Sequence, residues 1–223
     1  MKVHLPTSPQ EAVGLLGEGT LIAGGTHVMP RLAPTESLVS LRRAGLGGIE
    51  EDGDTILIGA TTTLAEVGRR VPFLTDAIES IASPTIRNLA TVGGNLFVPQ
   101  PHGDLAVCLL ALDAQIDKLD GLVTSISFRV PERWFYTKAM RRKQNSASIV
   151  TVASDGVKIA LGGVAPEPVR ATKAEEALAQ GDLEGAAEAA LDAADPFDDA
   201  YASAWYRRRV LPVHVRRALS HAV

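Results

Sequence analysis

The sequence predicts an α+β protein of two domains. Over residues 1–130, short apolar runs alternate with helical patterns and glycine-rich turns. Beyond about residue 131, three β-like runs are followed by alanine-rich helical segments. A chain of 223 residues, of which 46% are hydrophobic, is large enough to bury a core in each part. We therefore expect a first domain over residues 1–130 and a smaller α+β domain, a three-stranded sheet with helices, over residues 131–223.

The first domain is expected to begin with a capped helix. Ser8-Pro9-Gln10-Glu11 is a capping box with proline at the first helical position, so the helix should run to about Leu16. An apolar strand over residues 20–23 then enters a first glycine pair. Further strands are expected at residues 38–41 and 55–58, joined by a turn-rich connection over residues 45–54.

Helices dominate the rest of this domain. They are expected at residues 64–68, 73–82 and 105–112, and Ser83-Pro84 should end the second of them. A second glycine pair follows that break. Asp104 stands at the N-cap of the third helix, where capping and a contact with a ligand are both plausible roles for its carboxylate.

In the second domain, strands are expected at residues 135–139, 148–153 and 158–164, with Ser154-Asp155-Gly156 as a hairpin turn. Helices should follow at residues 173–180 and 183–194, and a last one should start near Asp198. Alanine favours helix and carries no chemistry, so these helices are expected to act as scaffold.

Two glycine pairs are the main candidates for a ligand site. They lie in Ala23-Gly24-Gly25-Thr26-His27 and Thr91-Val92-Gly93-Gly94-Asn95, each after an apolar run. Glycine allows positive φ and close approach of the backbone, so successive N–H groups can converge on an anion such as a diphosphate. A single pair is more often a plain turn, whereas two pairs can grip one dinucleotide from both sides. Neither segment contains lysine or arginine, so backbone N–H groups, Thr26, Thr91 and Asn95 must supply the hydrogen bonds.

Composition excludes several other functions. A net charge of −4 and a pI near 5.7 give no support for nucleic-acid binding. No apolar stretch approaches the roughly 18 residues of a membrane span, and the start resembles no signal peptide, so a cytoplasmic location is expected. The single cysteine, Cys108, lies in an apolar segment and reads as a buried thiol, which leaves no disulfide, iron–sulfur cluster or thiolate zinc site. The five histidines show no metal-ligand spacing. Redox chemistry would therefore need a bound organic cofactor.

Four segments in order carry a family resemblance: residues 22–26, 58–63, 83–95 and 206–211. The chain resembles the FAD-binding medium subunit of the molybdenum hydroxylases, the xanthine dehydrogenase and carbon monoxide dehydrogenase family. The block Arg87-Asn88-Leu89-Ala90-Thr91-Val92-Gly93-Gly94-Asn95 is its most specific part. The resemblance implies a FAD-binding domain of the vanillyl-alcohol-oxidase and p-cresol-methylhydroxylase type, in two subdomains, followed by a smaller C-terminal domain.

The resemblance also implies which residues bind FAD. The glycine segments would hold the diphosphate, Asp104 the ribose or ribityl part, and Val123 and Lys138 would lie nearer the isoalloxazine ring. A solvated strand lysine is the other interpretation of Lys138. The expected FAD-binding residues are Ala23, Gly24, Gly25, Thr26, His27, Thr91, Gly93, Gly94, Asn95, Asp104, Val123 and Lys138. No catalytic acid or base and no metal ligand are expected.

Two departures from the family pattern stand out. His27 follows Thr26, but covalent relatives place the histidine directly after the glycine pair, so we expect a backbone donor with an outward ring rather than a histidyl–flavin bond. Between residues 118 and 122 only Leu119-Asp120-Gly121 remains where relatives carry some two dozen more residues. Asp-Gly favours a tight hairpin, and a segment missing from the sequence is the alternative. The shortening puts the surroundings of Val123 in question.

By resemblance, the chain would receive electrons from an iron–sulfur small subunit, which takes them from a molybdopterin large subunit, and pass them through FAD to a terminal acceptor. Two alternatives remain open: a stand-alone FAD-dependent reductase or oxidase of the same fold, and a flavin-binding module without turnover. The basic run Arg207-Arg208-Arg209, with Arg216-Arg217, fits either a solvated helix face or a subunit contact. Pro212 should kink or divide this last helix.

Overall fold

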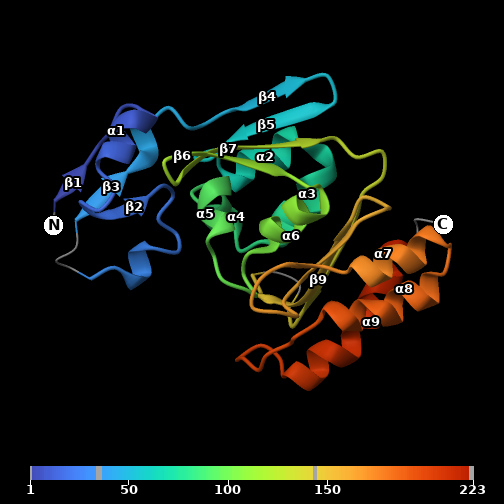
Figure 1. Ribbon diagram of the computed structural model, residues 1–223. Helices are drawn as coiled ribbons and strands as arrows, with labels where there is room; N and C mark the ends of the chain where they lie inside the picture. The colour runs from blue at the N-terminus through green and yellow to red at the C-terminus, as the bar shows by residue number, and fades with distance from the viewer. Residues whose placement is uncertain (1, 34–36, 143–144, 221–223) are drawn as a thin grey trace.

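The computed structural model describes residues 2–33, 37–142 and 145–220 (Figure 1). Within these ranges the strands form three sheets, ordered β1-β3-β2, β4-β5-β7-β6 and β11-β10-β9-β8. The strands are β1 Val3–His4, β2 Thr20–Ile22, β3 Leu38–Ser40, β4 Ile49–Asp52, β5 Thr55–Gly59, β6 Gln115–Leu119, β7 Leu122–Arg129, β8 Phe135–Met140, β9 Ser148–Ser154, β10 Ile159–Gly162 and β11 Val169–Arg170. The α-helices are α1 Pro9–Gly14, α2 Leu64–Arg70, α3 Thr75–Ser80, α4 Pro84–Arg87, α5 Val92–Leu96, α6 Asp104–Ala111, α7 Thr172–Ala179, α8 Leu183–Ala189 and α9 Ala204–Leu219. Short 3-10 turns lie at Met29–Arg31, Leu41–Arg43, Pro72–Leu74 and Ala190–Ala193.

The N-terminal sheet is small and parallel, with α1 beside it (Figure 1, blue). The expected capping box forms, since the Ser8 hydroxyl accepts from the N–H of Glu11 at 3.1 Å. The helix ends at Gly14, two residues earlier than expected. Strand β2 of this sheet runs directly into the first glycine pair.

The middle sheet is antiparallel and has helices α2, α3 and α6 on one face (Figure 1). Ile58, Ile126 and Phe128 of its strands pack with Leu64 and Leu105 of these helices in one core. Strand β4, with its acidic residues 50–52, was expected to be a turn-rich connection. It forms because Gly53, at φ +60°, closes a hairpin with β5 and because β4 is an edge strand in which all three acidic residues are exposed to solvent.

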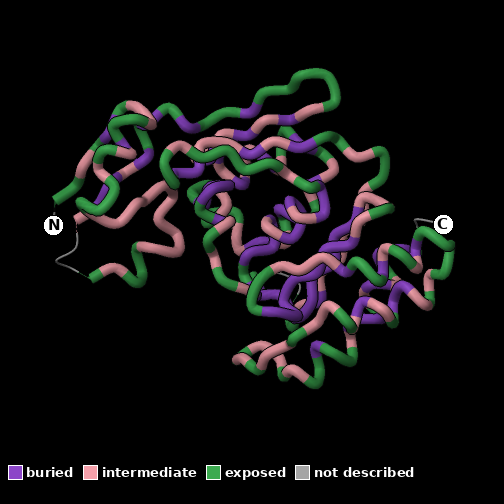
Figure 2. The backbone as a smooth tube through the Cα atoms, in the orientation of Figure 1, coloured by how far each residue is buried: buried purple, intermediate pink, exposed green. Residues whose placement is uncertain are grey.

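The C-terminal sheet lies between α6 on one face and α9 on the other, so every residue of β9 is buried (Figure 2). The three expected strand runs are β8, β9 and β10, and the two-residue strand β11 adds a fourth at the edge. Helices α7 and α8 complete the outer layer with α9. Ala153 and Ala160 also belong to the core of the middle sheet, so the two sheets share their helical layer.

Several helices differ from expectation, among them the one expected over residues 183–194, which is α8 followed by a 3-10 turn. The helix expected over residues 73–82 is a 3-10 turn followed by α3, which ends at Ser80. Helix α9 begins at Ala204 rather than near Asp198, because the Ser203 hydroxyl caps it by accepting from the N–H of Tyr206. The helix also continues through Pro212 to Leu219, so the expected division is not found.

Strand β7 ends at Arg129 and β8 begins at Phe135, on either side of the boundary predicted near residue 131. That division into two domains stays a prediction, since the structure alone defines no boundary. Across the described ranges, no helix has both the length and the apolar character needed to cross a membrane.

Candidate functional site

Each glycine pair packs closely against a neighbouring backbone segment, the first against Leu89, just before the second pair, and the second against Ala60. A Cβ atom built at Gly24 would lie 1.8 Å from the carbonyl oxygen of Leu89, and one built at Gly93 would lie 2.9 Å from that of Ala60. Neither glycine has positive φ. These two positions therefore require glycine because another backbone segment lies close to them. Positive φ, the other reason that the sequence suggested, does not apply to either position.

The first glycine pair opens a turn with unpaired donors. Gly25 adopts φ +72°, and its carbonyl oxygen accepts from the N–H of Met29 at 2.9 Å. The N–H groups of Thr26, His27 and Val28, inside this turn, donate to no other residue that the structure describes. The Arg31 guanidinium fixes the turn by donating to the His27 carbonyl at 2.8 Å. Three adjacent free N–H groups make a concavity that suits an anion.

The second glycine pair is helical rather than a loop. Thr91 is the N-cap of α5, and its hydroxyl accepts from the N–H of Gly94 at 3.2 Å. The N–H of Gly93 donates to Ala60 and that of Asn95 donates to the Thr91 carbonyl. This corrects the expectation that both glycine segments present free N–H groups, because the donors of the second one already have partners inside the protein.

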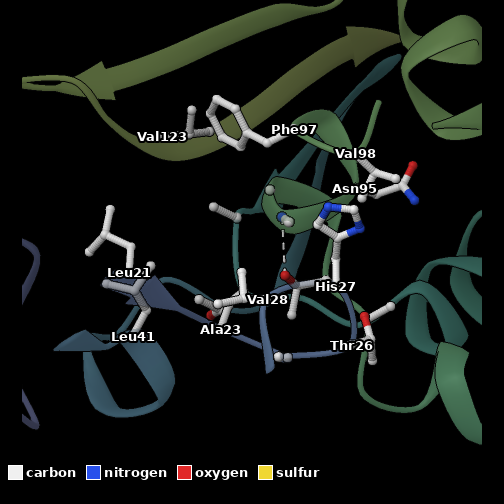
Figure 3. Close-up of a pocket in the computed structure, with 18 of the residues that line it drawn as sticks. Leu21, Ala23, Thr26, His27, Val28, Leu41, Asn95, Phe97, Val98 and Val123 are labelled. Carbon is white, nitrogen blue, oxygen red and sulfur yellow. Dashed lines mark hydrogen bonds between the residues drawn. The ribbon is translucent and has the colours of Figure 1, made fainter. Parts of the chain in front are cut away.

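The larger of two adjoining cavities has a volume of about 530 Å³ and is lined by both glycine segments. Figure 3 shows Leu21 and Leu41 on one side of it and Val123 beside Phe97 on another. Leu122 also lines it, so its walls away from the glycines are largely apolar. Such a space fits a flat, mostly apolar ring with a polar extension toward the glycine turn.

The smaller cavity, of about 300 Å³, is polar and charged. Its lining includes His102, Asp104, Lys138, Arg142 and Tyr201. The two cavities share a partition made of Thr26, His27, Ala90, Asn95 and Val98.

Asn95 carries an unsatisfied polar atom in this partition. Its side-chain oxygen Oδ1 is buried and has no hydrogen-bond partner. A buried amide oxygen without a partner is costly, and a ligand hydroxyl would satisfy it. The sequence predicts that Asn95 binds an anion, but only the NH₂ group of its side chain can donate a hydrogen bond to an anion.

Asp104 and Lys138 form an ion pair of 2.8 Å, with only 2% and 3% of their side chains exposed. The Asp104 carboxylate also accepts from the hydroxyls of Ser148 and Thr151, the latter at 2.6 Å. Lys138 donates a second hydrogen bond, to the Ser80 carbonyl at 2.9 Å. Asp104 is therefore not a plain helix cap: Gly103 holds the N-cap position, and no side-chain cap bond is made. Lys138 is not a solvated strand lysine.

Val123 and Lys138, both expected near one ring, line different cavities. Val123 stands on β7, just after the connection from β6. That connection is a two-residue turn, Asp120-Gly121, in which both residues have positive φ and Leu119 pairs with Leu122. The tight hairpin expected from Asp-Gly therefore forms in the chain as given, and it places Gly121 and Val123 in the wall of the larger cavity.

Two histidines lie in or beside the smaller cavity. Figure 3 shows the His27 ring pointing toward Asn95 and Val98, not outward as expected from the sequence. Burial, aided by the charge of Arg31, lowers the pKa of His27. Burial also lowers the pKa of His102 against the opposing effect of Asp104. The His102 ring meets the ring of Tyr201 edge-on, with centroids 5.5 Å apart. Both imidazoles are held toward the neutral form.

Sequence reasoning missed several residues of the site. Sequence periodicity predicts Ser148 and Thr151 only as strand residues, and it assigns no site role to Phe97, His102 or Tyr201. A hydroxyl pair inside an otherwise apolar buried strand was the available signal, since buried hydroxyls need partners. Cys108, by contrast, is a fully buried thiol as expected, and burial raises its pKa.

Comparisons with known proteins agree with this geometry. Residues 1–152 match the family model described as "FAD binding domain in molybdopterin dehydrogenase", and residues 134–222 match "CO dehydrogenase flavoprotein C-terminal domain". The chain is 28% identical to the carbon monoxide dehydrogenase medium chain of Hydrogenophaga pseudoflava, covering 98% of this chain and 96% of that one. It is 30% identical to the 6-hydroxypseudooxynicotine dehydrogenase complex subunit alpha of Paenarthrobacter nicotinovorans, covering 97% and 92%.

A solved structure is similar over the whole chain. Carbon monoxide dehydrogenase from Hydrogenophaga pseudoflava lacking the Mo-pyranopterin moiety of its cofactor contains a chain that matches with a TM-score of 0.88 at 28% identity, covering 100% of this chain and 96% of that chain. The alignment with the medium chain of the same organism runs over 274 positions, more than the 223 residues present here, so that relative carries additional segments.

Proposed function

Since the chain belongs to the FAD-binding subunits of the molybdenum hydroxylase (molybdopterin dehydrogenase) family, we propose that it is the electron-transfer flavoprotein of a heteromeric enzyme. In this proposal it receives electrons from iron–sulfur clusters on a small subunit, served by a molybdopterin large subunit, and delivers them to a terminal acceptor. The observation that carries the proposal is the joined pair of cavities, with both glycine segments at their meeting point.

The residues present fit FAD. The free N–H groups of Thr26, His27 and Val28 suit a diphosphate, which carries acceptors only. The unpartnered Oδ1 of Asn95 needs a donor, which a sugar or ribityl hydroxyl supplies. The larger cavity is apolar enough for a ring system. A dinucleotide has all three of these parts in a line, with its diphosphate in the middle.

We assign roles to the chain's residues accordingly. Thr26, His27 and Val28 bind the diphosphate, and Gly24 and Gly93 keep the backbones close enough for the partition to form. The apolar walls of the larger cavity hold one ring end of the dinucleotide. The smaller cavity, with its buried cation, holds the other end. Because Lys138 has three N–H protons and two are already engaged, the third can donate to a ligand acceptor.

Bound FAD supplies the redox chemistry, since a flavin can take electrons singly and release them as a pair. The chain's own contribution is to bind, orient and electrostatically tune the cofactor. The buried ammonium of Lys138 favours negative charge on a neighbouring group, and the exclusion of water strengthens that effect. No side chain needs to act as a general acid or base.

The first test is to identify the cofactor. The purified chain should show the absorbance bands of oxidised flavin, and mass analysis of the released compound should give FAD. If the chain is isolated empty, added FAD should bind more tightly than FMN, because FMN lacks the adenylate half and so leaves one cavity unfilled. A chain that binds FMN as well as FAD would contradict the two-cavity assignment.

The second test separates the electron-transfer subunit from a stand-alone flavoenzyme and from a binding module. The tagged chain, expressed in its native host, should copurify with subunits that contain iron–sulfur clusters and molybdenum. Flavin in that complex should bleach on addition of a reducing substrate of the molybdenum subunit. Reduction of the isolated chain by a substrate of its own would favour the stand-alone enzyme. A flavin that no donor reduces would favour the module.

A further inference from the structure

Arg207 differs from the basic residues around it. Its side chain is fully buried, whereas Arg208 and Arg209 next to it are exposed. The solvated-face and subunit-contact interpretations of this basic run therefore do not apply to Arg207. A buried guanidinium is kept only where several acceptors surround it, and here its partners come from two separate parts of the chain.

One set of partners consists of backbone carbonyls at the start of β9 and just after β10. The Nη1 atom of Arg207 donates to the carbonyl oxygens of Ser148 at 3.2 Å, Ile149 at 2.6 Å and Gly163 at 2.7 Å. Ser148 is the residue whose hydroxyl donates to the Asp104 carboxylate. The guanidinium thus holds the backbone of a residue that directly contacts the buried ion pair.

The other set of partners is the loop before α9. The Nη2 atom donates to the Asp199 carboxylate at 2.6 Å, and the guanidinium lies 4.8 Å from the centre of the Phe197 ring. Asp199 in turn accepts from the N–H groups of Tyr201 at 2.8 Å and Ala202 at 2.9 Å. Tyr201 places its ring against His102, and both residues line the smaller cavity.

We propose that Arg207 is a positioning residue that sets the shape of the smaller cavity by tying together two of its edges. One edge is the segment of Ser146 and Ala147, which leads into Ser148, the residue whose hydroxyl orients Asp104 and through it Lys138. The other is the loop that carries Tyr201. Arg207 itself touches no ligand, since it is not part of the cavity lining.

Arginine is required here because of its geometry. The fork of the guanidinium offers donors in two directions, so one side chain can bind β9 through Nη1 and Asp199 through Nη2. The ammonium of a lysine has three donors at a single point and a shorter reach. A lysine at this position can keep the positive charge and one set of contacts, but not both. Arg207→Lys therefore separates the role of the fork from the need for a buried charge.

The inference rests on the proposed FAD site only for its cofactor readout, so the experiment includes a measurement without cofactor. In the FAD-free protein, the NMR titration of the His102 ring reports on its packing against Tyr201. In the FAD-loaded protein, the dissociation constant and the reduction potential of the flavin report on Asp104 and Lys138. Variants Arg207→Lys and Asp199→Asn are compared with Arg208→Lys, a matched control on the exposed face.

Arg207→Lys should move the His102 pKa upward toward its ordinary value, shift the flavin potential, and weaken FAD binding by roughly 10-fold, which corresponds to the net loss of about one hydrogen bond to the ligand. Asp199→Asn should loosen the packing of the Tyr201 ring against His102, seen as a weaker nuclear Overhauser contact between the two rings, with a smaller effect on FAD because it releases only one edge; its His102 pKa is not the readout, since the Asp199 charge itself raises that pKa. Arg208→Lys should change none of these quantities.

The proposal is overturned if Arg207→Lys lowers the stability but leaves the His102 titration, the flavin potential and the FAD affinity at their wild-type values. Arg207 would then be a purely structural residue. If Arg207→Lys does not fold, Asp199→Asn decides: an unchanged nuclear Overhauser contact between the rings of His102 and Tyr201 refutes the tie. Failure of wild-type protein to bind FAD would count against the proposed function, while the His102 result would stand by itself.

Discussion

Replacing Gly24 by alanine tests whether the close contact between the first glycine pair and Leu89, just before the second pair, creates the cofactor site. The new Cβ atom would lie 1.8 Å from the carbonyl oxygen of Leu89 and 2.6 Å from its carbonyl carbon. Both are backbone atoms, so no side-chain rotation relieves the clash. Because real Cβ atoms do not come within 3.0 Å of such neighbours, the first turn must move away from Leu89 by about 1.2 Å.

This displacement is large relative to a hydrogen bond. An N–H···O bond of about 2.9 Å that lengthens by that amount is no longer a hydrogen bond. Loss of two charge-assisted bonds to the diphosphate, at about 1.5 to 3 kcal/mol each, would weaken FAD binding by roughly 10² to 10⁴-fold. The overpacking itself should lower the free energy of unfolding by about 1 to 3 kcal/mol, which a domain of ordinary stability survives.

The assay is a titration of FAD-free protein with FAD, followed by the change in flavin fluorescence, beside a urea unfolding curve without cofactor. Gly14→Ala is the matched control. No atom lies within 4 Å of a Cβ built at Gly14, at the end of α1. That variant should bind FAD like the wild type and should be equally or slightly more stable. Wild-type FAD affinity in a folded Gly24→Ala protein would refute the reasoning, because the diphosphate would then not depend on the separation of the two segments.

Three further outcomes are expected. Thr91→Ala should lower the free energy of unfolding by about 1 kcal/mol through loss of the α5 cap, and Thr91→Ser should restore it; equal urea midpoints for both variants would exclude a capping role. Lys138→Met should cost about 3 to 5 kcal/mol because it leaves the Asp104 carboxylate buried without a cation, and adding Asp104→Asn should recover part of that loss, which a double-mutant cycle in urea measures. Burial lowers the pKa of His102 in the folded protein, so the unfolded chain binds a proton more readily than the folded protein does. The free energy of unfolding should therefore be highest above about pH 6.5 and should decrease as the pH falls below that value. The decrease should stop once the pH is below the pKa of His102 in the folded protein. Unfolding midpoints of His102→Gln should then depend less on pH between 7 and 5, and an unchanged slope would contradict this assignment.

The sequence predicted most elements because its local signals and its tertiary structure agree. The capping box at Ser8, the Asp120-Gly121 hairpin and the wholly buried strand β9 all formed near their expected positions. Strand β4 was missed because its acidic residues favour a turn by composition alone. The hydrogen bonds between β4 and β5 stabilise the strand, and local residue propensity does not predict which strands will pair.

The candidate site was predictable in outline but not in chemistry. Both glycine segments were found, and they do line one cavity. The expectation that Gly93 and Gly94 offer free N–H groups to a ligand is wrong, because these N–H groups donate to Ala60 and Thr91. Whether an N–H is free depends on which carbonyl tertiary packing brings beside it, and no spacing along the chain reveals that.

The two hydroxyl groups that bind Asp104 also could not be predicted from sequence spacing. Ser148 and Thr151 are three residues apart, so a regular strand would direct them to opposite faces. The register of β8 with β9 shifts between Ala139 and Met140, where Val150 and Ser148 are the paired residues and Ile149 is passed over. This bulge places both hydroxyls against one carboxylate. Sequence periodicity would have separated the two residues.

In the proposed binding mode, the partition of Thr26, His27, Ala90, Asn95 and Val98 would make the two cavities act as two linked binding sites for one ligand. Fragments of a dinucleotide would each meet only one chamber, and both fragments could occupy the protein together without competing. Joining them covalently gives the second half a local concentration in the millimolar range or above, so the intact molecule outcompetes an equal mixture of its pieces. Discrimination between whole cofactor and metabolic fragments thus follows from the geometry of a shared wall, without any residue devoted to rejecting the smaller molecules.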